Sequence, residues 1–344
     1  MKYLFIILVI LQLVVSIEAK QWTVSNNPLF IAQFTSLKTA IDSASVGDTI
    51  YVYQSPNHHG TVTIDKGLTI IGAGYHPSQK SYVQFIVSAD NVNITGFEAN
   101  ITAGSVTLKV KNLTISNVYG SINLVNVENG IIFNSMFNYI YTTDVSVKDF
   151  IITNCFIGKL ACTDKAQLLV SNNNFLRNST CDGSVRSVFA NASNCITTKG
   201  ITIDNNLFVN GTPSQLEFCS INNNLTFNTA QNTLPYGNNT GKGNIINQDP
   251  KFVGNYTSDV SINQIISNNI DYRLEVDSPA INAGTDSTDI GVTGGLFPWP
   301  KNANGTLDYT GAPRIPIIEY FQLKNTVVGK DGTLRFNVKG RKSK

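Results

Sequence analysis

Charged side chains are rare in this sequence, but several gather in one stretch. Asp, Glu, Lys and Arg make up 14% of the 344 residues, and Arg177, Asp182, Arg186 and Lys199 all fall between two apolar segments, with Lys165 shortly before them. In a lyase for uronate sugars, an arginine would neutralise the substrate carboxylate and a desolvated lysine or arginine would remove the neighbouring proton. Without catalysis, the same groups would attract an anionic sugar chain. Lys165, Arg177, Asp182 and Arg186 are therefore the candidate glycan-binding residues.

A simpler interpretation of this stretch is a solvated surface loop closed by a disulfide. Joining Cys181 to Cys195 would lower the entropic cost of closing the loop. All five cysteines lie between Cys155 and Cys219, so an oxidising compartment would allow one or two disulfides and leave one thiol over. We favour this interpretation over a catalytic one and predict that Cys181 and Cys195 pair, with the loop overhanging one side of the fold.

Other reactions find less support in the residues. Glycoside hydrolysis needs two carboxyl groups that face each other, and Asp144 and Asp164 occupy different offsets before their strands. His58, His59 and His76 lack the spacing of metal ligands. The sequence has no phosphate-binding glycine loop, nucleophile motif or nucleic-acid motif. No cofactor and no nucleic-acid partner are predicted.

The first residues have the layout of a secretory signal peptide. An apolar run from Tyr3 to Ile17 follows a lysine and ends just before Ala19, after which we expect cleavage. The alternative, a membrane anchor, needs about 20 apolar residues, and no later stretch is apolar enough to span a bilayer. Residues 20–344 are expected to be secreted, without a transmembrane segment.

Short segments with two apolar positions recur along the chain. The members of each pair are separated by one residue, which places both on one side of a strand. A period this short leaves no room for a crossover helix, so the strands must coil around an axis and pair in parallel. An antiparallel sandwich, the alternative, would need a turn every 8 to 12 residues or so. The pairs are Val92/Ile94, Leu113/Ile115, Ile131/Phe133, Phe150/Ile152, Leu168/Val170 and Ile201/Ile203, which begin 21, 18, 19, 18 and 33 residues apart.

Asparagines and aromatic residues follow the strands. Asparagine tolerates the left-handed conformation of a sharp turn, and its side chain can bond to the same atom one coil away. Stacks of asparagines are therefore expected in the turns. The aromatic residues are Tyr119, Phe137, Phe156, Phe175 and Phe208, and Asn117, Asn154, Asn173 and Asn206 stand two positions before four of them.

The two ends of the array differ from its middle. An apolar stripe with i, i+3, i+4, i+7 spacing from Leu37 to Ala44 predicts a short helix, about residues 36–46, that caps the first coil. From Phe297 prolines break the pattern, and residues 315–323 and 333–338 are predicted strands before a basic tail. We expect this appendage, residues 297–344, to pack on the last coil and block edge-to-edge association.

Four segments resemble a known superfamily. Residues 34–52 and 63–74 read FTSLKTAIDSASVGDTIYV and TIDKGLTIIGAG, and they resemble the opening of secreted proteins of the pectin-lyase-like superfamily. Residues 243–254 and 271–291 read GNIINQDPKFVG and DYRLEVDSPAINAGTDSTDIG, and they resemble the closing segment of many secreted right-handed β-helix repeat proteins. The resemblance implies an all-β chain with one right-handed parallel β-helix over residues 20–296. It implies less about function, because the superfamily includes lyases, hydrolases, esterases, epimerases and proteins with no assigned activity.

The closing segment has a structural explanation of its own. Asp286 and Asp289 are expected to cap local backbone amides. A calcium site is the alternative, but two carboxylates without further clustered oxygen ligands are few for this ion.

These observations favour a secreted, non-catalytic protein whose faces of Asn, Thr and Tyr bind a polysaccharide or another component of the cell envelope. The alternative is a polysaccharide-active enzyme, above all a lyase for uronate-containing polysaccharide. The basic tail offers a contact for an acidic partner. The sequence leaves the oligomeric state open.

Overall fold

The chain winds into one parallel β-helix of about eight turns, which confirms the predicted fold class. The computed structural model describes residues 19–77, 81–163, 166–176, 187–189, 197–255, 260–313, 317–323 and 336–341, and for residues 143–145 and the last two segments it describes the backbone alone. The strands of the helix are β1 (Gln21–Val24), β2 (Thr49–Val52), β3 (Thr61–Ile64), β4 (Thr69–Ile71), β5 (Tyr82–Val87), β6 (Asn93–Ala103), β7 (Val110–Phe133), β8 (Met136–Thr153), β9 (Phe156–Ala161), β10 (Ala166–Ser171), β11 (Asn174–Phe175), β12 (Thr198–Lys199), β13 (Thr202–Asp204), β14 (Leu207–Val209), β15 (Leu216–Glu217), β16 (Ser220–Asn222) and β17 (Leu225–Phe227).

Each coil contributes to more than one parallel sheet. The first sheet contains β2, β4, the start of β6, two stretches of β7, the end of β8, and then β10, β13 and β16. The second sheet contains β3 and β5, the later parts of β6, β7 and β8, and then β9, β11, β14 and β17. Side chains that point inward from both sheets form the main core.

Five of the six predicted apolar pairs point into this core. Ile131/Phe133 is wrong by one residue, because Gly130 and Ile132 are the positions that align with Phe150 and Ile152. Ile132 is fully buried, whereas Ile131 and Phe133 are partly exposed on the outer face. A Cβ atom on Gly130 would come within 2.5 Å of the Phe150 ring, so the glycine makes room for this aromatic side chain one coil away. The five confirmed pairs are Val92/Ile94, Leu113/Ile115, Phe150/Ile152, Leu168/Val170 and Ile201/Ile203.

The predicted asparagine stacks are present, but the left-handed turn conformation and the hydrogen bonds between coils belong to different, neighbouring asparagines. Asn154 has the left-handed conformation (φ 50°), as does Asn117, whereas on later coils Asn172 and Asn205 take this position. On these later coils, the residue that follows the left-handed asparagine in the chain belongs to a buried hydrogen-bonded ladder. In this ladder Asn173 donates to Asn206 (3.0 Å) and Asn206 to Asn224 (3.0 Å). The aromatic series is likewise mixed, because Phe156 aligns with Met136, whereas Phe175 aligns with Phe208.

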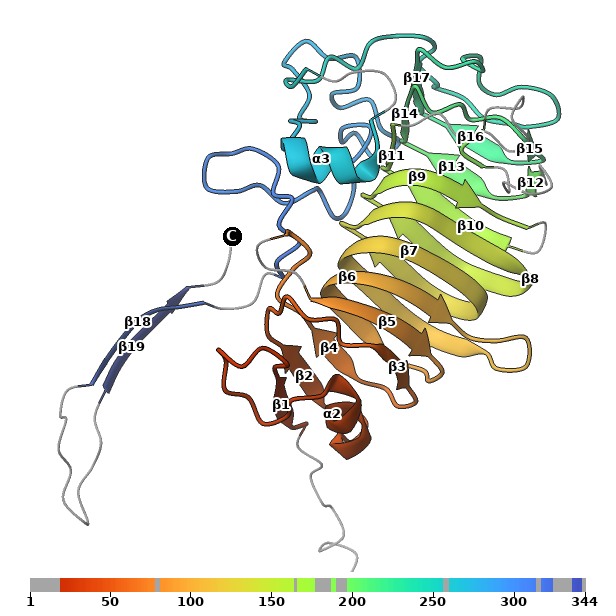
Figure 1. Ribbon diagram of the computed structural model, residues 1–344. Helices are drawn as coiled ribbons and strands as arrows, with labels where there is room; N and C mark the ends of the chain where they lie inside the picture. Colours follow the sequence, from red (N-terminus) through yellow and green to blue (C-terminus); the bar gives the residue numbers. More distant parts are fainter. Residues whose placement is uncertain are drawn as a thin grey trace, which may run out of the picture.

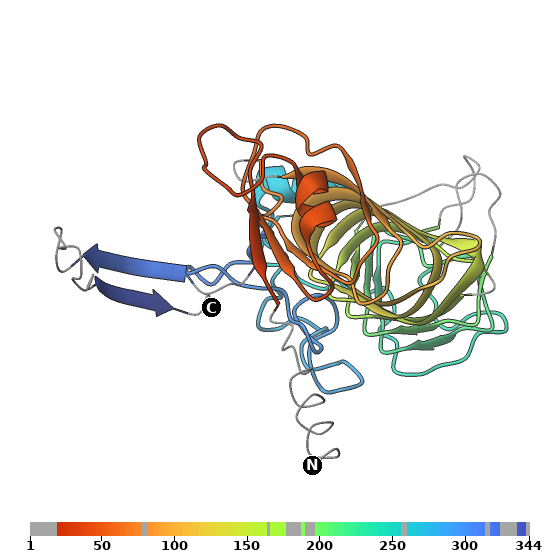
Figure 2. The same ribbon diagram turned by 90° about the horizontal axis from the view of Figure 1, so that it is seen from below.

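The predicted capping helix is present as α2 (Leu37–Ser43). Its buried residues Leu37, Ala40 and Ile41 belong to the main core. The helix lies across the end of the first coil, as the view along the solenoid in Figure 2 shows. It therefore covers apolar side chains that the first coil alone would expose.

The chain after the last coil returns along one flank of the solenoid and builds a second core there. It includes α3 (Ile262–Asn268), whose Ile262, Ile265 and Ile266 are buried. The Phe156 ring lies at the centre of this core, with its centroid 4.8 Å from that of Trp299 and 5.4 Å from that of Tyr272. The second core thus covers part of the outer face of the second sheet, around Met136, Phe156 and Leu207.

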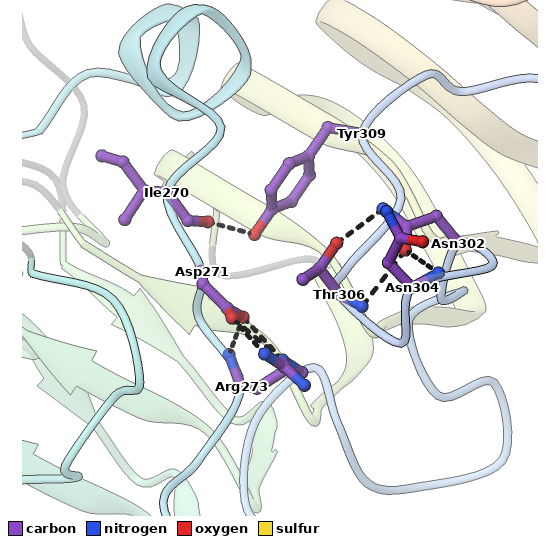
Figure 3. A network of polar contacts seen from close by, with 7 residues as sticks. All are labelled: Ile270, Asp271, Arg273, Asn302, Asn304, Thr306 and Tyr309. Carbon is purple, nitrogen blue, oxygen red and sulfur yellow. Dashed lines mark hydrogen bonds and ion pairs between the residues drawn. The ribbon is translucent and has the colours of Figure 1, made fainter.

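Polar contacts tie the returning chain together in the same region (Figure 3). The Tyr309 hydroxyl donates to the Ile270 carbonyl (2.7 Å), and Arg273 forms an ion pair with Asp271 (2.6 Å). Beyond Tyr309, the amide of Tyr75 donates to the Thr310 carbonyl (3.0 Å). Residues 297–313 therefore run toward an early coil, and the predicted packing of this segment on the last coil is wrong.

Two strands follow, as the sequence predicts. β18 (Ile317–Leu323) and β19 (Phe336–Arg341) pair antiparallel. The hairpin points away from the solenoid in both views (Figures 1 and 2). No helix among the described residues is long and apolar enough to cross a membrane.

Candidate functional site

The glycan-binding residues predicted from the sequence lie outside the described part of the chain. The loop groove, the disulfide and their roles therefore stay predictions. Asp164 and the side chain of Asp144 are not described either, so the carboxylate pair that they would form also stays open. Lys199 is described, and its Nζ atom lies 3.1 Å from the Glu217 carboxylate. The predicted site residues concerned are Lys165, Arg177, Cys181, Asp182, Arg186 and Cys195.

The three described cysteines are buried and free. Cys155, Cys162 and Cys219 all point into the main core. Burial raises the pKa of the Cys155 thiol to about 12, which keeps this group protonated and unreactive near neutral pH. These cysteines behave as small core residues.

The described residues contain no group of three or more His, Cys, Asp or Glu side chains that could hold a metal ion. Asp286 accepts hydrogen bonds from the Thr288 amide (3.1 Å) and hydroxyl (2.8 Å), and Asp289 accepts one from the Asn282 amide (3.1 Å). Both carboxylates therefore cap local backbone amides, as predicted.

Two adjoining hollows lie on the outer face of the first sheet. In its later coils Ile131, Ile151, Leu169 and Thr202 follow one another in register, one per coil. The residue after each of them in its strand is buried. Because side chains alternate along a strand, these four residues project outward. Ile131, Ile151 and Leu169 thus form an apolar row on a partly exposed face whose other residues are mainly Thr, Ser and Asn.

A segment of the returning chain forms a wall beside this row. We call residues 283–297 the strap. Left-handed asparagines from successive coils hold it: Asn223 donates to the Ala283 carbonyl (2.8 Å), and Asn154 donates to the Gly294 carbonyl (2.6 Å). Between them, Asn205 both donates to the Thr285 hydroxyl (3.0 Å) and accepts from its amide (2.8 Å). These left-handed asparagines, one per coil, therefore hold the strap along the solenoid axis.

The strap and the first sheet enclose a cavity of about 240 Å³, here named the strap groove. Its floor includes Ile151 and Leu169, and Asp286 and Phe297 come from the strap. The Phe297 ring stacks on Phe133 with a centroid distance of 4.3 Å, which closes one end with aromatic carbon.

Asp204 supplies a second carboxylate to the strap groove. It projects from β13 and accepts a hydrogen bond from the Asn222 side chain (2.9 Å). Burial raises the pKa of Asp204, and the hydrogen bonds from Asn222 oppose this shift. Asp286 is exposed and is held by Thr288, so the two carboxyl groups of the groove have different environments.

A second cavity of about 380 Å³, the open hollow, adjoins the strap groove and shares Ile151 and Leu169 with it. Asp149, Gln167 and Thr202 line its other side. No lysine or arginine is present among the described residues that line the two cavities. Their polar groups are carboxylates, amides and hydroxyls, all of which can form hydrogen bonds with the hydroxyl groups of an uncharged ligand. The carboxylates would repel an anionic ligand.

Sequence reasoning missed this site because no local signal marks it. Asp204 and Asp286 are 82 positions apart, and the residues that join them in space, Asn205 and Thr285, resemble ordinary turn residues in the sequence. The outward position of Ile151 could be read from its place between the core residues Phe150 and Ile152. The wall could not, because it depends on the path of the returning chain.

Comparison with known proteins adds no family. A scan against protein-family models finds no match, and a search among curated proteins finds none either. The fold is therefore established by the strand pairing described above, and the resemblance to pectin-lyase-like proteins stays a resemblance of sequence segments.

Proposed function

We propose that this protein is a secreted, non-catalytic binding protein for an extended glycan, which lies over the strap groove and the open hollow. The observation that carries the proposal is the pair of adjoining cavities that share Ile151 and Leu169. Sugar rings present apolar C–H faces and polar hydroxyl edges, and this site offers a flat apolar row between carboxylates and amides. Pockets with this division, mainly apolar with a few placed polar groups, are typical of small-molecule recognition.

The charges of the site favour an uncharged glycan. Among the described residues that line the two cavities, Asp149, Asp204 and Asp286 are the charged ones, and a uronate chain would bring further negative charge close to them. Binding of an anionic chain, as expected from the sequence, requires the residues of the 177–196 stretch. An acidic component of the cell envelope stays the partner proposed for that stretch and for the basic tail.

The proposal is tested by blocking both cavities at once. Leu169→Arg places a long side chain on the row that the cavities share, and we expect it to weaken binding of neutral glucan oligosaccharides at least about 10-fold in titration calorimetry. Ile86→Arg is the matched control, because Ile86 is 37% exposed and lies on another sheet. Equal binding by Leu169→Arg and the wild type, or binding of uronate oligosaccharides alone, would contradict the proposal.

A second candidate function is glycoside hydrolysis, which the two unequal carboxyl groups of the strap groove favour. A carboxyl group with a raised pKa can act as the acid while an ionised one acts as the base or nucleophile. Release of reducing ends from a neutral glycan, abolished by Asp204→Asn, would replace the non-catalytic proposal with this one. Formation of an unsaturated, ultraviolet-absorbing product from a uronate polymer would instead establish the lyase alternative.

A further inference from the structure

A third cavity lies on the same side of the molecule, near the start of the solenoid. It has a volume of about 350 Å³, and its lining includes Phe30, Tyr51, Tyr53 and Ile71. Tyr51 and Tyr53 both project outward from the first coil, because Val52 between them is buried. The Phe30 ring stands edge-on to Tyr53 with a centroid distance of 6.1 Å. We call this cavity the aromatic pocket.

The aromatic pocket and the strap groove lie over the same sheet, and the row of aligned residues between them includes Thr95 and Ser116, which are buried. Tyr51 aligns with Ile71 on the next coil, Ile71 with Thr95, and Thr95 with Ser116. The Asn129 side chain donates to Asn112, which places residues 129–133 one coil beyond 112–116. Three coil steps therefore separate Ile71 from the coil that carries Ile131, a distance of about 14 Å at roughly 4.8 Å per step.

We propose that the aromatic pocket is a second subsite for the same uncharged glycan, so that one chain lies along the first sheet from the strap groove to Tyr51 and Tyr53. This inference rests on the proposed function. The row between the sites is suited to such a chain, because Thr69, Asn93 and Thr114 are aligned in register and partly exposed. Their hydroxyl and amide groups pair with sugar hydroxyls at each step.

The chemistry of the pocket distinguishes it from the strap groove. The described residues of its lining include no charged one, and its main features are two tyrosine rings, a phenylalanine and the side-chain amide of Gln54. A tyrosine ring gives an apolar face for the C–H side of a sugar and a hydroxyl group at the rim. The adjacent Ile31 is 98% exposed, so a longer ligand meets further apolar surface there.

Two subsites on one rigid face predict a step in affinity with chain length. Once the first site holds an oligosaccharide, its free end reaches the second at a high effective concentration. We expect calorimetric titration with neutral glucan oligosaccharides, from disaccharide to decasaccharide, to show weak binding of the short members and a rise of at least about 10-fold when the chain spans both sites.

The variant Tyr51→Ala/Tyr53→Ala should remove this step and leave the affinity for short oligosaccharides in the strap groove unchanged. Tyr53→Phe retains the ring and should keep most of the step. Tyr139→Ala is the matched control, since Tyr139 is 39% exposed on the second sheet. Circular dichroism melting checks that all variants fold.

The outcomes separate the two proposals. Suppose that short oligosaccharides bind to the protein with Leu169 intact, but that the tyrosine variants do not alter the dependence of affinity on chain length. This result would overturn the second subsite alone. Absence of binding at every length would overturn the proposed function and this inference together. A step that the double tyrosine variant abolishes and Tyr53→Phe preserves supports the inference.

Discussion

The outer faces of the first and second sheets differ in what lies over them. Along β10 of the first sheet, buried Leu168 and Val170 flank the partly exposed Leu169. In β9 of the second sheet all six residues are buried. A strand that is covered on both faces can be apolar throughout, whereas a strand with one open face alternates. The returning chain thus covers the second sheet around Phe156 and leaves a hollow over Ile151 and Leu169 of the first sheet.

The largest test of this difference is a truncation in the second core. Phe156→Ala removes the ring that contacts Trp299, Tyr272 and Tyr309, and we expect a loss of about 3–5 kcal/mol in the free energy of unfolding, the usual cost of a large core truncation. Urea unfolding measures it. The control is Tyr139→Ala, because this exposed side chain lies on the same sheet outside the second core and should change stability by less than about 1 kcal/mol. Similar losses for both variants would mean that the second core is not tightly packed.

A smaller loss of stability is expected where Asn205 bonds to the strap. Asn205→Gly keeps a residue that accepts the left-handed conformation (φ 58°) but removes both hydrogen bonds to Thr285. We expect a loss of about 1 kcal/mol, the usual net contribution of hydrogen bonds, because Thr285 is exposed and can bond to water instead. We also expect faster amide hydrogen exchange in residues 283–291. Asn91→Gly is the matched control, since Asn91 has the same conformation (φ 60°) and its side chain accepts a hydrogen bond from Asn112 on the next coil. Unchanged exchange in Asn205→Gly would show that the strap is held by packing alone.

A further expected effect is a pH dependence of stability near the start of the solenoid. Burial, with a lesser contribution from His58, lowers the pKa of His59 from 6.5 to about 4. The unfolded chain therefore binds more protons than the folded one between these values, so stability is complete above about pH 6.5 and falls as the pH drops toward 4. The expected loss between about pH 7.5 and pH 5 is up to 2 kcal/mol or so.

The replacement His59→Gln should flatten this part of the pH profile, measured as the urea midpoint, and His58→Gln should leave most of it. The second core behaves differently, because burial raises the pKa of Tyr75, Tyr272 and Tyr309, and these groups do not titrate near neutral pH. An acid-side slope that survives His59→Gln would assign the dependence to other groups.

Much of the solenoid could be predicted because its signals are local and repeat. Alternating apolar residues identify strands, and a near-constant period identifies coils. The register failed at Ile131/Phe133, where Gly130 takes a core position. A glycine carries no apolar signal, and its role depends on the Phe150 ring one coil away. The aromatic series failed for a related reason, since Phe156 faces outward into the second core while Phe175 faces inward.

The sequence by itself determined the parallel coils, the asparagine turns, the capping helix and the two terminal strands, because each of these depends on residues close together along the chain. The tertiary structure alone decided where the returning chain lies, and hence which sheet is covered and where the strap groove forms. Asn91 and Asn112, which bond to each other, have the same left-handed turn conformation as Asn205 and Asn223, which bond to the strap. The hydrogen bonds between such asparagines and a strap some 60 to 140 residues away become visible only in the folded molecule, because the turn needs only the residue's own conformation, whereas the bond needs a distant partner brought within reach.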